Sequence, residues 1–382
     1  MILEVQKFLH NNGLDKLQSD YSIIARRHSE YNNLICLKYN MIDSPMAKTI
    51  SQECRGLILD EDNDWSIVSY PFNKFFNSAE GLADSIDWNT AKVVEKCDGS
   101  LMTLYHYDNK WHVQSSGTAD AVGPLNTDIP WREDGKLVTL SPNSFASYFW
   151  KIATLTKMDI NPLMKSIPTD MCFMFEVMGP LNRIIVRHDI SKIVLIGARN
   201  IKTGKELTVE DAVKLLPGNV PIVKTYSLKT MEDINTSLPN INPLDQEGYV
   251  VLDAEFNRVK VKAPAYVAMH HAKGNEVTFK KLLAIAVAGE NDEWVAYFDE
   301  HKEDMAIVRN GLSDLIFEVE SDYKEIISEV GGEATAKEFA MLAKNTRCPS
   351  ALFAFRSGKI DSIKSYIRNI RLDSLISLID FD

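Results

Sequence analysis

A lysine in a short polar turn is the first candidate for covalent chemistry in this chain. Lys96-Cys97-Asp98-Gly99-Ser100 lies between two runs of strand-forming residues, so we expect Lys96 at a fixed and accessible position. Gly99 lets a ligand approach the backbone closely. A nucleophilic lysine must lose its proton, and a fall of its pKa from about 10.4 to about 7 costs about 4 kcal/mol. The competing interpretation is an ordinary surface lysine on a hairpin.

Two lysines farther along the chain would help to meet that cost. Val259-Lys260-Val261-Lys262 alternates strictly, so the two ammonium groups project from one face of a strand. Their mutual repulsion favours a bound polyanion, and two such cations lower the pKa of a neighbouring lysine. The alternative is an exposed edge strand that carries lysines against aggregation.

Two glutamates lie in apolar runs, where a carboxylate needs a partner. Glu247 begins the run 247–252, which we expect to pair with the lysine strand as a hairpin, and its carboxylate would bridge a divalent metal to phosphate. Glu176 lies in the middle of residues 173–179, where burial demands ligand hydroxyls or a structural arginine such as Arg183. Glu247 also fits a plain turn residue.

Basic and aromatic residues upstream of Lys96 form a further candidate group. Arg55 precedes a predicted strand, and Lys74 and Phe76 alternate on one face of residues 71–77. An arginine, a lysine and an aromatic ring together clamp phosphates and stack on a base. Taken singly, each of these residues also fits a structural role.

The distribution of residue types along the chain predicts the strands and helices that position these residues. From about residue 34 to residue 262, short runs rich in β-branched and aromatic residues alternate with turn residues, which predicts many short strands. Helices are expected from Asn143 and from Thr208, the second with a threonine cap. Beyond Pro264, apolar residues recur at helical spacing. The sequence therefore predicts an α+β domain of antiparallel sheets over 1–264 and an all-α domain over 265–382.

Composition and charge exclude several classes of protein. The chain has 382 residues, of which 45% are hydrophobic and 25% charged, so it is neither disordered nor collagen-like. The net charge of −11 argues against coating nucleic acid by bulk charge, but residues 290–338 alone hold fifteen acidic and four basic side chains, which equals the whole excess. Five scattered cysteines without a C-x-x-C pair argue against a disulfide framework and a structural zinc site. With no signal peptide and no apolar run of membrane length, we expect a soluble, cytoplasmic protein.

Several motifs occur together in one order along the chain. K-C-D-G-S at Lys96, F-E-V-M-G at Glu176, E-G-Y-V-V at Glu247 and V-K-V-K at Lys260 resemble the motifs of covalent nucleotidyltransferases, which include RNA ligases, DNA ligases and capping enzymes. E-C-R-G-L, P-F-N-K-F-F-N and P-L-N-R-I-I make the chain similar to the ATP-dependent RNA ligases of the T-even phage type. The resemblance covers the N-terminal domain nearly throughout and continues weakly beyond it. It implies a nucleotidyltransferase domain, ATP-grasp-like, before the helical one.

The resemblance also implies a role for individual residues. Lys96 would attack the α-phosphate of ATP to form lysyl-AMP, and Tyr266 matches a tyrosine that the family needs for ligation. Glu247 and Asp292 would be associated with Mg²⁺, or with Mn²⁺ in its place. The residues implied in binding ATP are Tyr39, Arg55, Lys74, Phe76, Lys96, Glu176, Lys260 and Lys262.

One position departs from the family pattern. The hairpin after the nucleophile reads Gln114-Ser115-Ser116-Gly117, whereas the family has a basic residue just before the glycine. That contact with phosphate or nucleoside is therefore missing or comes from another position.

The reaction that the resemblance implies is the joining of a 5′-phosphate RNA end to a 3′-hydroxyl end in RNA repair. A cleaved tRNA anticodon loop is the implied type of substrate, and a monomer the expected state. Lys364, Arg368 and Arg371 form a basic stripe on a predicted helix, which we hypothesise to touch RNA phosphates; a solvated helix face is the alternative.

Two rival functions remain open at this point. A DNA ligase or an mRNA capping enzyme shares the motifs, but both usually append a β-barrel rather than helices. A non-catalytic protein that binds nucleotides or RNA ends is the other rival, and the intact Lys96 with its basic partners speaks against it.

Overall fold

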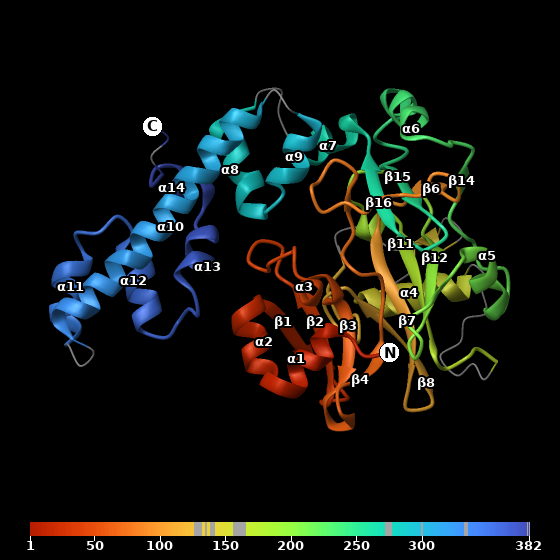
Figure 1. The fold of residues 1–382 in the computed structure, drawn as a ribbon, viewed down its shortest axis with the longest axis horizontal. Helices are drawn as coiled ribbons and strands as arrows, with labels where there is room; N and C mark the ends of the chain where they lie inside the picture. The colour runs from red at the N-terminus through yellow and green to blue at the C-terminus, as the bar shows by residue number, and fades with distance from the viewer. Residues whose placement is uncertain are drawn as a thin grey trace. The chain divides into compact units, whose positions relative to one another are not determined.

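The structure is a computed structural model that describes residues 1–125, 132–133, 136–137, 142–155, 166–271, 277–298, 301–331, 335–379 and 381. The chain divides into two compact units, Met1–His270 and His271–Asp382 (Figure 1). Sheets and short helices build the first unit, in which one four-stranded and two five-stranded sheets are the largest, and helices follow one another along the second. Among the described residues, no helix is both long and apolar enough to cross a membrane.

The first sheet has four antiparallel strands in the order β1-β2-β3-β4. They are β1 (Ile23–Arg27), β2 (Leu34–Tyr39), β3 (Arg55–Asp60) and β4 (Ser66–Ser69). Helices α1 (Glu4–Asn12), α2 (Leu14–Tyr21) and α3 (Thr49–Glu53) cover one face, where Leu37 and Leu57 are fully buried. Glu53 ties this layer together, because its carboxylate accepts hydrogen bonds from the backbone N–H groups of Glu4 (3.2 Å) and Val5 (2.8 Å) at the start of α1.

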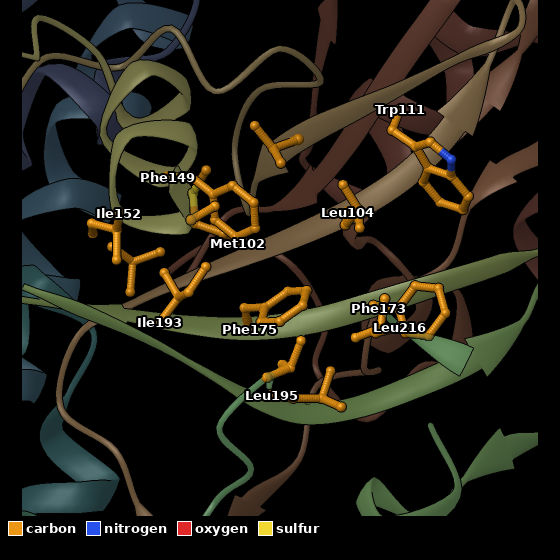
Figure 2. Packing of buried hydrophobic residues seen from close by; sticks show 14 of the residues in the cluster. Met102, Leu104, Trp111, Phe149, Ile152, Phe173, Phe175, Ile193, Leu195 and Leu216 are labelled. Carbon is orange, nitrogen blue, oxygen red and sulfur yellow. The ribbon is translucent and has the colours of Figure 1, made fainter. Parts of the chain in front are cut away.

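The second sheet has five antiparallel strands in the order β13-β12-β11-β7-β8. They are β7 (Ser100–Tyr107), β8 (Lys110–Ser115), β11 (Met171–Met178), β12 (Lys192–Asn200) and β13 (Glu206–Leu207). Helix α4 (Phe145–Leu155) packs on one face, where Phe149 and Ile152 lie against Phe175 and Ile193 (Figure 2). The other face packs against the first sheet through Cys36, Tyr105 and Met174, so Glu176 extends from a rigid strand.

The third sheet carries both Lys96, on β6, and the lysine strand, β16, with β15 between them (Figure 1). Its order is β14-β6-β15-β16-β5, with only β5 running parallel to its neighbour. The strands are β5 (Phe76–Asn77), β6 (Lys92–Lys96), β14 (Thr225–Tyr226), β15 (Gly248–Leu252) and β16 (Arg258–Lys262). Helix α6 (Met231–Ser237) contributes Ile234 to the apolar cluster on its reverse face, together with Tyr249, Val259 and Val261.

Helix α7 (Pro264–His271) leads from the lysine strand into the second unit. The described helices of that unit are α8 (Phe279–Ala288), α9 (Asn291–Tyr297), α10 (Lys302–Val330), α11 (Ala336–Ala343), α12 (Pro349–Arg356), α13 (Ile363–Arg368) and α14 (Leu372–Ile376). α10 buries the apolar residues that the helical spacing predicted, among them Val308, Leu315 and Val319.

The predicted basic stripe does not lie on one helix, so that part of the sequence interpretation is wrong. α13 ends at Arg368, and Arg371 is the N-cap of the next helix, α14. Asn369 explains the break, because its side-chain amide donates to the carbonyl of Ser365 (2.8 Å) and competes with continued helix.

Most predicted elements of the first unit are confirmed, but several short helices were missed. The strand runs from Leu34 to Lys262 form strands, and the side chain of Thr208 caps α5 (Val209–Ala212) by accepting from Asp211 N. The helix predicted from Asn143 begins at Phe145; its predicted end, residues 156–158, lies outside the described residues. α1 and α2 were not predicted. All five cysteines are free and buried.

Candidate active site

A cavity of about 320 Å³ is lined by residues of the three larger sheets of the first unit. The first sheet contributes Arg55, the second Glu176, and the third Lys96, which is the last residue of β6. Apolar side chains form much of the remaining wall: Phe72, Phe75, Val94, Leu101, Ile196, Val223, Val250 and Leu252. A lining of both charged and apolar side chains suits a ligand with a polyanionic part and a flat apolar part.

Strand register brings the predicted nucleophile and the lysine strand together. Gly248 of β15 pairs with Lys96 on one side and with Lys262 on the other, so all three lie in one row. In the next row on the same face, Val250 pairs with Lys260. Gly248 has φ of 151°, and a Cβ there would lie 2.2 Å from the carbonyl oxygen of Val261. Only glycine fits this point of the sheet.

Glu247 connects the two lysines through its carboxylate. The Nζ atom of Lys96 donates to Oε2 at 2.7 Å, and the Nζ atom of Lys262 lies 3.4 Å from Oε1. The Glu247 side chain is only 4% exposed, against 21% for Lys96. A carboxylate so deeply buried needs both cations, so these three residues form one charged unit.

Glu176 contributes a buried carboxyl group to the wall of the cavity. Burial raises its pKa to about 7, although the positive charges of Lys96 and Arg55 oppose that rise. Glu247 and Asp98 contribute negative charge and so add to the rise. Glu176 is therefore half protonated near neutral pH and can both donate to and accept from ligand hydroxyls.

Arg55 faces the cavity with unused donor capacity. Its Nη1 atom is buried and has no hydrogen-bond partner among the described residues. Its Cζ atom lies 5.5 Å from the ring centroid of Phe75, which also lines the cavity. A buried guanidinium with an unused N–H is costly without a ligand, and phosphate oxygens match its geometry.

Lys74, Tyr39 and Phe76 gather beside this cavity rather than in its wall. The Nζ atom of Lys74 lies 5.5 Å from the Tyr39 ring centroid and 5.4 Å from that of Phe76. Both rings are buried, and Tyr39 belongs to the core beneath the first sheet. Lys74 lines a neighbouring cavity of about 530 Å³, in which Phe75 is also found.

Asp98 organises the residues behind the nucleophile. Its carboxylate accepts hydrogen bonds from the hydroxyl of Tyr266 (2.7 Å) and from the backbone N–H groups of Ile185 (3.0 Å) and Val186 (2.7 Å). The Tyr266 ring also lies 5.8 Å from Nζ of Lys262. Tyr266 is 2% exposed, so in this structure it positions neighbours rather than projecting into the cavity.

Asp292 lies at the start of α9 in the second unit, where Asn291 donates to its carboxylate at 2.9 Å. Lys96 lies in the first unit. The described residues hold no cluster of three or more metal-ligating side chains. A divalent cation that keeps several waters and is held mainly by substrate phosphates needs only one or two protein carboxylates, and Glu247 offers one.

Arg258 is the site residue that sequence reasoning missed. It lines the cavity, forms an ion pair with Glu206 at 2.8 Å, and its Cζ atom lies 4.3 Å from the Phe72 ring centroid. The signal was present, because Arg258-Val259-Lys260-Val261-Lys262 alternates over five residues and puts three cations on one face.

Comparison with known proteins decides the family. The profile of a family described as RNA ligase matches residues 53–266, which is more than half of the chain. The chain belongs to this T4-type RNA ligase family. It is accordingly an ATP-dependent RNA ligase, and RNA is its class of substrate.

Individual relatives of this RNA ligase are distant. The RNA ligase of Rhodothermus phage RM378 is 27% identical over 363 residues, and the alignment covers 80% of each chain. A polynucleotide kinase/RNA ligase of Autographa californica nuclear polyhedrosis virus is 26% identical, and the match spans 79% of this chain but 42% of that protein.

Two solved structures are also similar at low identity. An archaeal ATP-dependent RNA ligase is 13% identical, with a TM-score of 0.44 and coverage of 90% of this chain and 82% of the other. A Naegleria gruberi RNA ligase with ATP and Mn is 18% identical, with a TM-score of 0.34 and coverage of 47% of this chain and 51% of the other.

Proposed function

We propose that this RNA ligase joins a 5′-phosphate RNA end to a 3′-hydroxyl end through a ligase–lysyl-AMP and an RNA-adenylate. The observation that carries the proposal is the convergence of Lys96, Arg55 and Glu176 on one cavity, where Glu247 pairs with Lys96 and also with Lys262. A nucleophile, a cationic surround and a carboxyl for hydroxyl groups are the parts that nucleotidyl transfer needs.

In the first step, Nζ of Lys96 attacks the α-phosphorus of ATP. A P–N bond forms, the bond from the α-phosphorus to the bridging oxygen breaks, and pyrophosphate leaves with its electron pair. The ammonium of Lys96 must first give up its proton, and the Glu247 carboxylate, which already accepts its hydrogen bond at 2.7 Å, is positioned to take it. Arg55, Lys74, Lys260 and Lys262 bind the phosphates and the charge that grows on them.

Glu247, which pairs with Lys96 of the cavity wall, is the residue that would hold a divalent cation, for which we propose Mg²⁺. When bound, the cation neutralises phosphate charge. A cation bound there would weaken the hold of Glu247 on Lys96, since one buried carboxylate cannot fully neutralise all of these positive charges. Asp292 is proposed as a second metal-associated residue, contributed by the second unit.

The nucleoside occupies the apolar part of the cavity. Val94 and Val250 are neighbours on the sheet and offer a flat apolar surface to the base, with Phe72 and Phe75 in the same wall. Glu176 bonds to the ribose hydroxyls, which a carboxyl group with a pKa near 7 can do as donor and acceptor. Tyr39 and Phe76 support Lys74 from below.

Two further transfers complete the reaction. An oxygen of the RNA 5′-phosphate attacks the phosphorus of lysyl-AMP, the P–N bond breaks, and Lys96 regains a proton. The 3′-hydroxyl of the other end then attacks the 5′-phosphate and AMP leaves. Tyr266 acts in these later steps as a positioning residue, through its bond to Asp98.

The second unit is proposed as an all-helical domain that selects the RNA, in a protein that acts as a monomer in RNA repair. Cleaved tRNA anticodon loops are the proposed substrate. Lys364 and Arg368 remain on α13 as candidate phosphate contacts, without Arg371.

The test is a joining assay with matched ends. Purified protein, ATP and Mg²⁺ are given single-stranded RNA or DNA of one sequence, each with a 5′-phosphate and a 3′-hydroxyl. We expect joined RNA from RNA ends, with AMP and pyrophosphate released in equal amounts. Joined DNA without joined RNA would contradict the proposal, and so would RNA joining that does not depend on ATP. A nicked tRNA anticodon stem, compared with an unstructured RNA, tests the proposed substrate.

A further inference from the structure

A row of cations crosses the first sheet from the cavity to the sheet edge. Lys38 of β2 pairs with Arg55 of β3, and on its other side it pairs with Ile24 of β1. Paired residues in antiparallel strands project from the same face, and so does Arg26, two residues after Ile24. The basic row, defined as Arg26, Lys38 and Arg55, therefore begins in the cavity wall and ends on the edge strand.

The basic row borders the hairpin that lacks its basic residue. A Cβ built on Gly117 would lie 3.5 Å from Nη1 of Arg26 and 3.8 Å from Nζ of Lys38, and Arg26 Nη1 lies 3.5 Å from the Gly117 carbonyl oxygen. Ser116, just before this glycine, also lines the cavity. Arg26 and Lys38 therefore supply positive charge beside Ser116, at the position where the family has a basic residue and this chain has a neutral serine.

Among the described residues, no acidic side chain forms an ion pair with Arg26, Lys38 or Arg55, although the charge of Arg55 acts on the carboxyl of Glu176. Nη1 of Arg55 is buried without a hydrogen-bond partner among them. Asp120 is the acid of this region, and its carboxylate already accepts from the backbone N–H of Ser29 at 3.0 Å. Like charges held side by side by strand pairing repel one another, unless an anion lies over them.

The shape of the basic row points to a chain of phosphates rather than to one anion. Neighbouring strands lie about 4.8 Å apart, so three strands span about 10 Å, more than one phosphate covers. Ile24 is 36% exposed beside Lys38, and its apolar side chain suits a ribose or base face better than a free anion. Arg26 is exposed at the outer end, so a strand of any length can continue into solvent.

We infer that Arg26 and Lys38 form a binding site for the phosphates of a single RNA strand, which they lead toward Arg55 and the cavity. The inference rests on the proposed function for the identity of the polyanion. It gives β1 and β2 a role in binding RNA that is separate from nucleotide binding, since Arg26 lies outside the nucleotide cavity.

The experiment measures RNA affinity in the absence of ATP. A 5′-phosphorylated oligouridylate is bound to wild-type protein and to Arg26→Gln, Lys38→Gln and the double variant over a series of NaCl concentrations. Each lost phosphate contact lowers the slope of log affinity against log salt by about 0.7 for a single strand, so the double variant should lose about 1.4.

Arg27→Gln is the matched control. It removes the same charge from the adjacent residue, which faces the other way and pairs with Glu61 at 2.7 Å. We expect its slope to equal that of wild type. A wild-type slope in the double variant would overturn the inference, and so would an equal loss in Arg27→Gln. A protein that shows the expected slopes but forms no lysyl-AMP would instead overturn the proposed function and leave this site standing.

Discussion

The Nζ atom of Lys96 lies 2.7 Å from the carboxylate of Glu247, and the same carboxylate lies 3.4 Å from Nζ of Lys262. The proposed nucleophile is therefore held in an ion pair before any substrate arrives. An ammonium in an ion pair has no free electron pair, so the bond to Glu247 has to open before Lys96 attacks. Strand register fixes this arrangement, because Lys96 and Lys262 flank Gly248.

Glu247→Gln should slow formation of lysyl-AMP by about 10²-fold, the usual cost of one electrostatic group at a reacting centre. The amide keeps the size of the side chain but offers neither a proton acceptor nor a negative charge to a divalent cation. Label transfer from ATP, measured over a range of Mg²⁺ concentrations, checks this, and added Mg²⁺ should not restore the rate. Glu210→Gln, which disturbs only an exposed pair with Lys92, should behave as wild type. A rate for Glu247→Gln within threefold of wild type would count against the role of Glu247.

The raised pKa of Glu176 makes the stability of the folded protein fall as the pH rises. Burial raises its pKa from 4.5 to about 7, so the folded protein holds a proton there that the unfolded chain releases between those values. The contribution of this carboxyl to stability is therefore present below pH 4.5 and is lost as the pH rises through 7. In thermal unfolding, wild type should lose stability relative to Glu176→Gln between pH 5 and about pH 8. A constant difference between the two proteins over this window would show that the pKa is not raised.

Asp98→Ala should destabilise the first unit by about 3 kcal/mol, because it removes a buried acceptor of three hydrogen bonds. Tyr266→Phe removes one of those bonds and should cost about 1 kcal/mol. Denaturant unfolding of the two variants, read beside their rates of sealing a pre-adenylylated RNA, separates stability from function. Equal unfolding midpoints for Asp98→Ala and wild type would contradict the account of Asp98 as an organiser.

Glu206 should matter far more than a surface glutamate. Burial alone would raise the pKa of its carboxyl, but Arg258 and Arg199 hold that pKa below its ordinary value. Glu206→Gln leaves two buried guanidinium groups without their anion, and we expect a loss of about 3 to 5 kcal/mol. Glu61→Gln, which breaks the exposed pair with Arg27, should cost less than about 1 kcal/mol. Similar losses in the two variants would contradict the contrast between buried and exposed pairs.

The ion pairs of Glu206 with Arg258 and Arg199 make stability depend on pH in the opposite direction to Glu176. Because the folded pKa of Glu206 is lowered, its contribution to stability is present above the unfolded pKa of 4.5 and is lost as the pH falls through the lower folded value. Glu206→Gln should therefore flatten the acid limb of the stability curve relative to wild type.

Local patterns predicted the strands well, since alternation and β-branched residues report directly on half-buried strands. They put Lys96 at the end of a strand, Lys260 and Lys262 on one face, and Glu247 at the start of a paired strand, and the structure has each of these. Asn369 shows the limit of such patterns: helical spacing continues past it, while its side chain ends the helix.

Contacts between sheets could not be predicted from local sequence patterns. Tyr39 and Lys38 are adjacent in sequence, yet strand alternation points the first into the core of α1 and α3 and the second toward Gly117. Which face of the sheet is buried and which borders the cavity depends on the segments that pack against it, and Gly117 lies more than seventy positions from Lys38. Arg258 was missed for a related reason, because its partner Glu206 lies on another sheet.

The central claim is that Lys96 becomes covalently adenylylated. The most direct measurement incubates the protein with ATP labelled in the α-phosphate and Mg²⁺, denatures it, and counts label on wild type, Lys96→Ala and Lys92→Ala. Lys92 lies on the same face of the same strand and is exposed, so its variant is the matched control. We predict label on wild type and on Lys92→Ala, released by acid as expected for a P–N bond, and none on Lys96→Ala. Undiminished label on Lys96→Ala, or no label on wild type, would contradict the account.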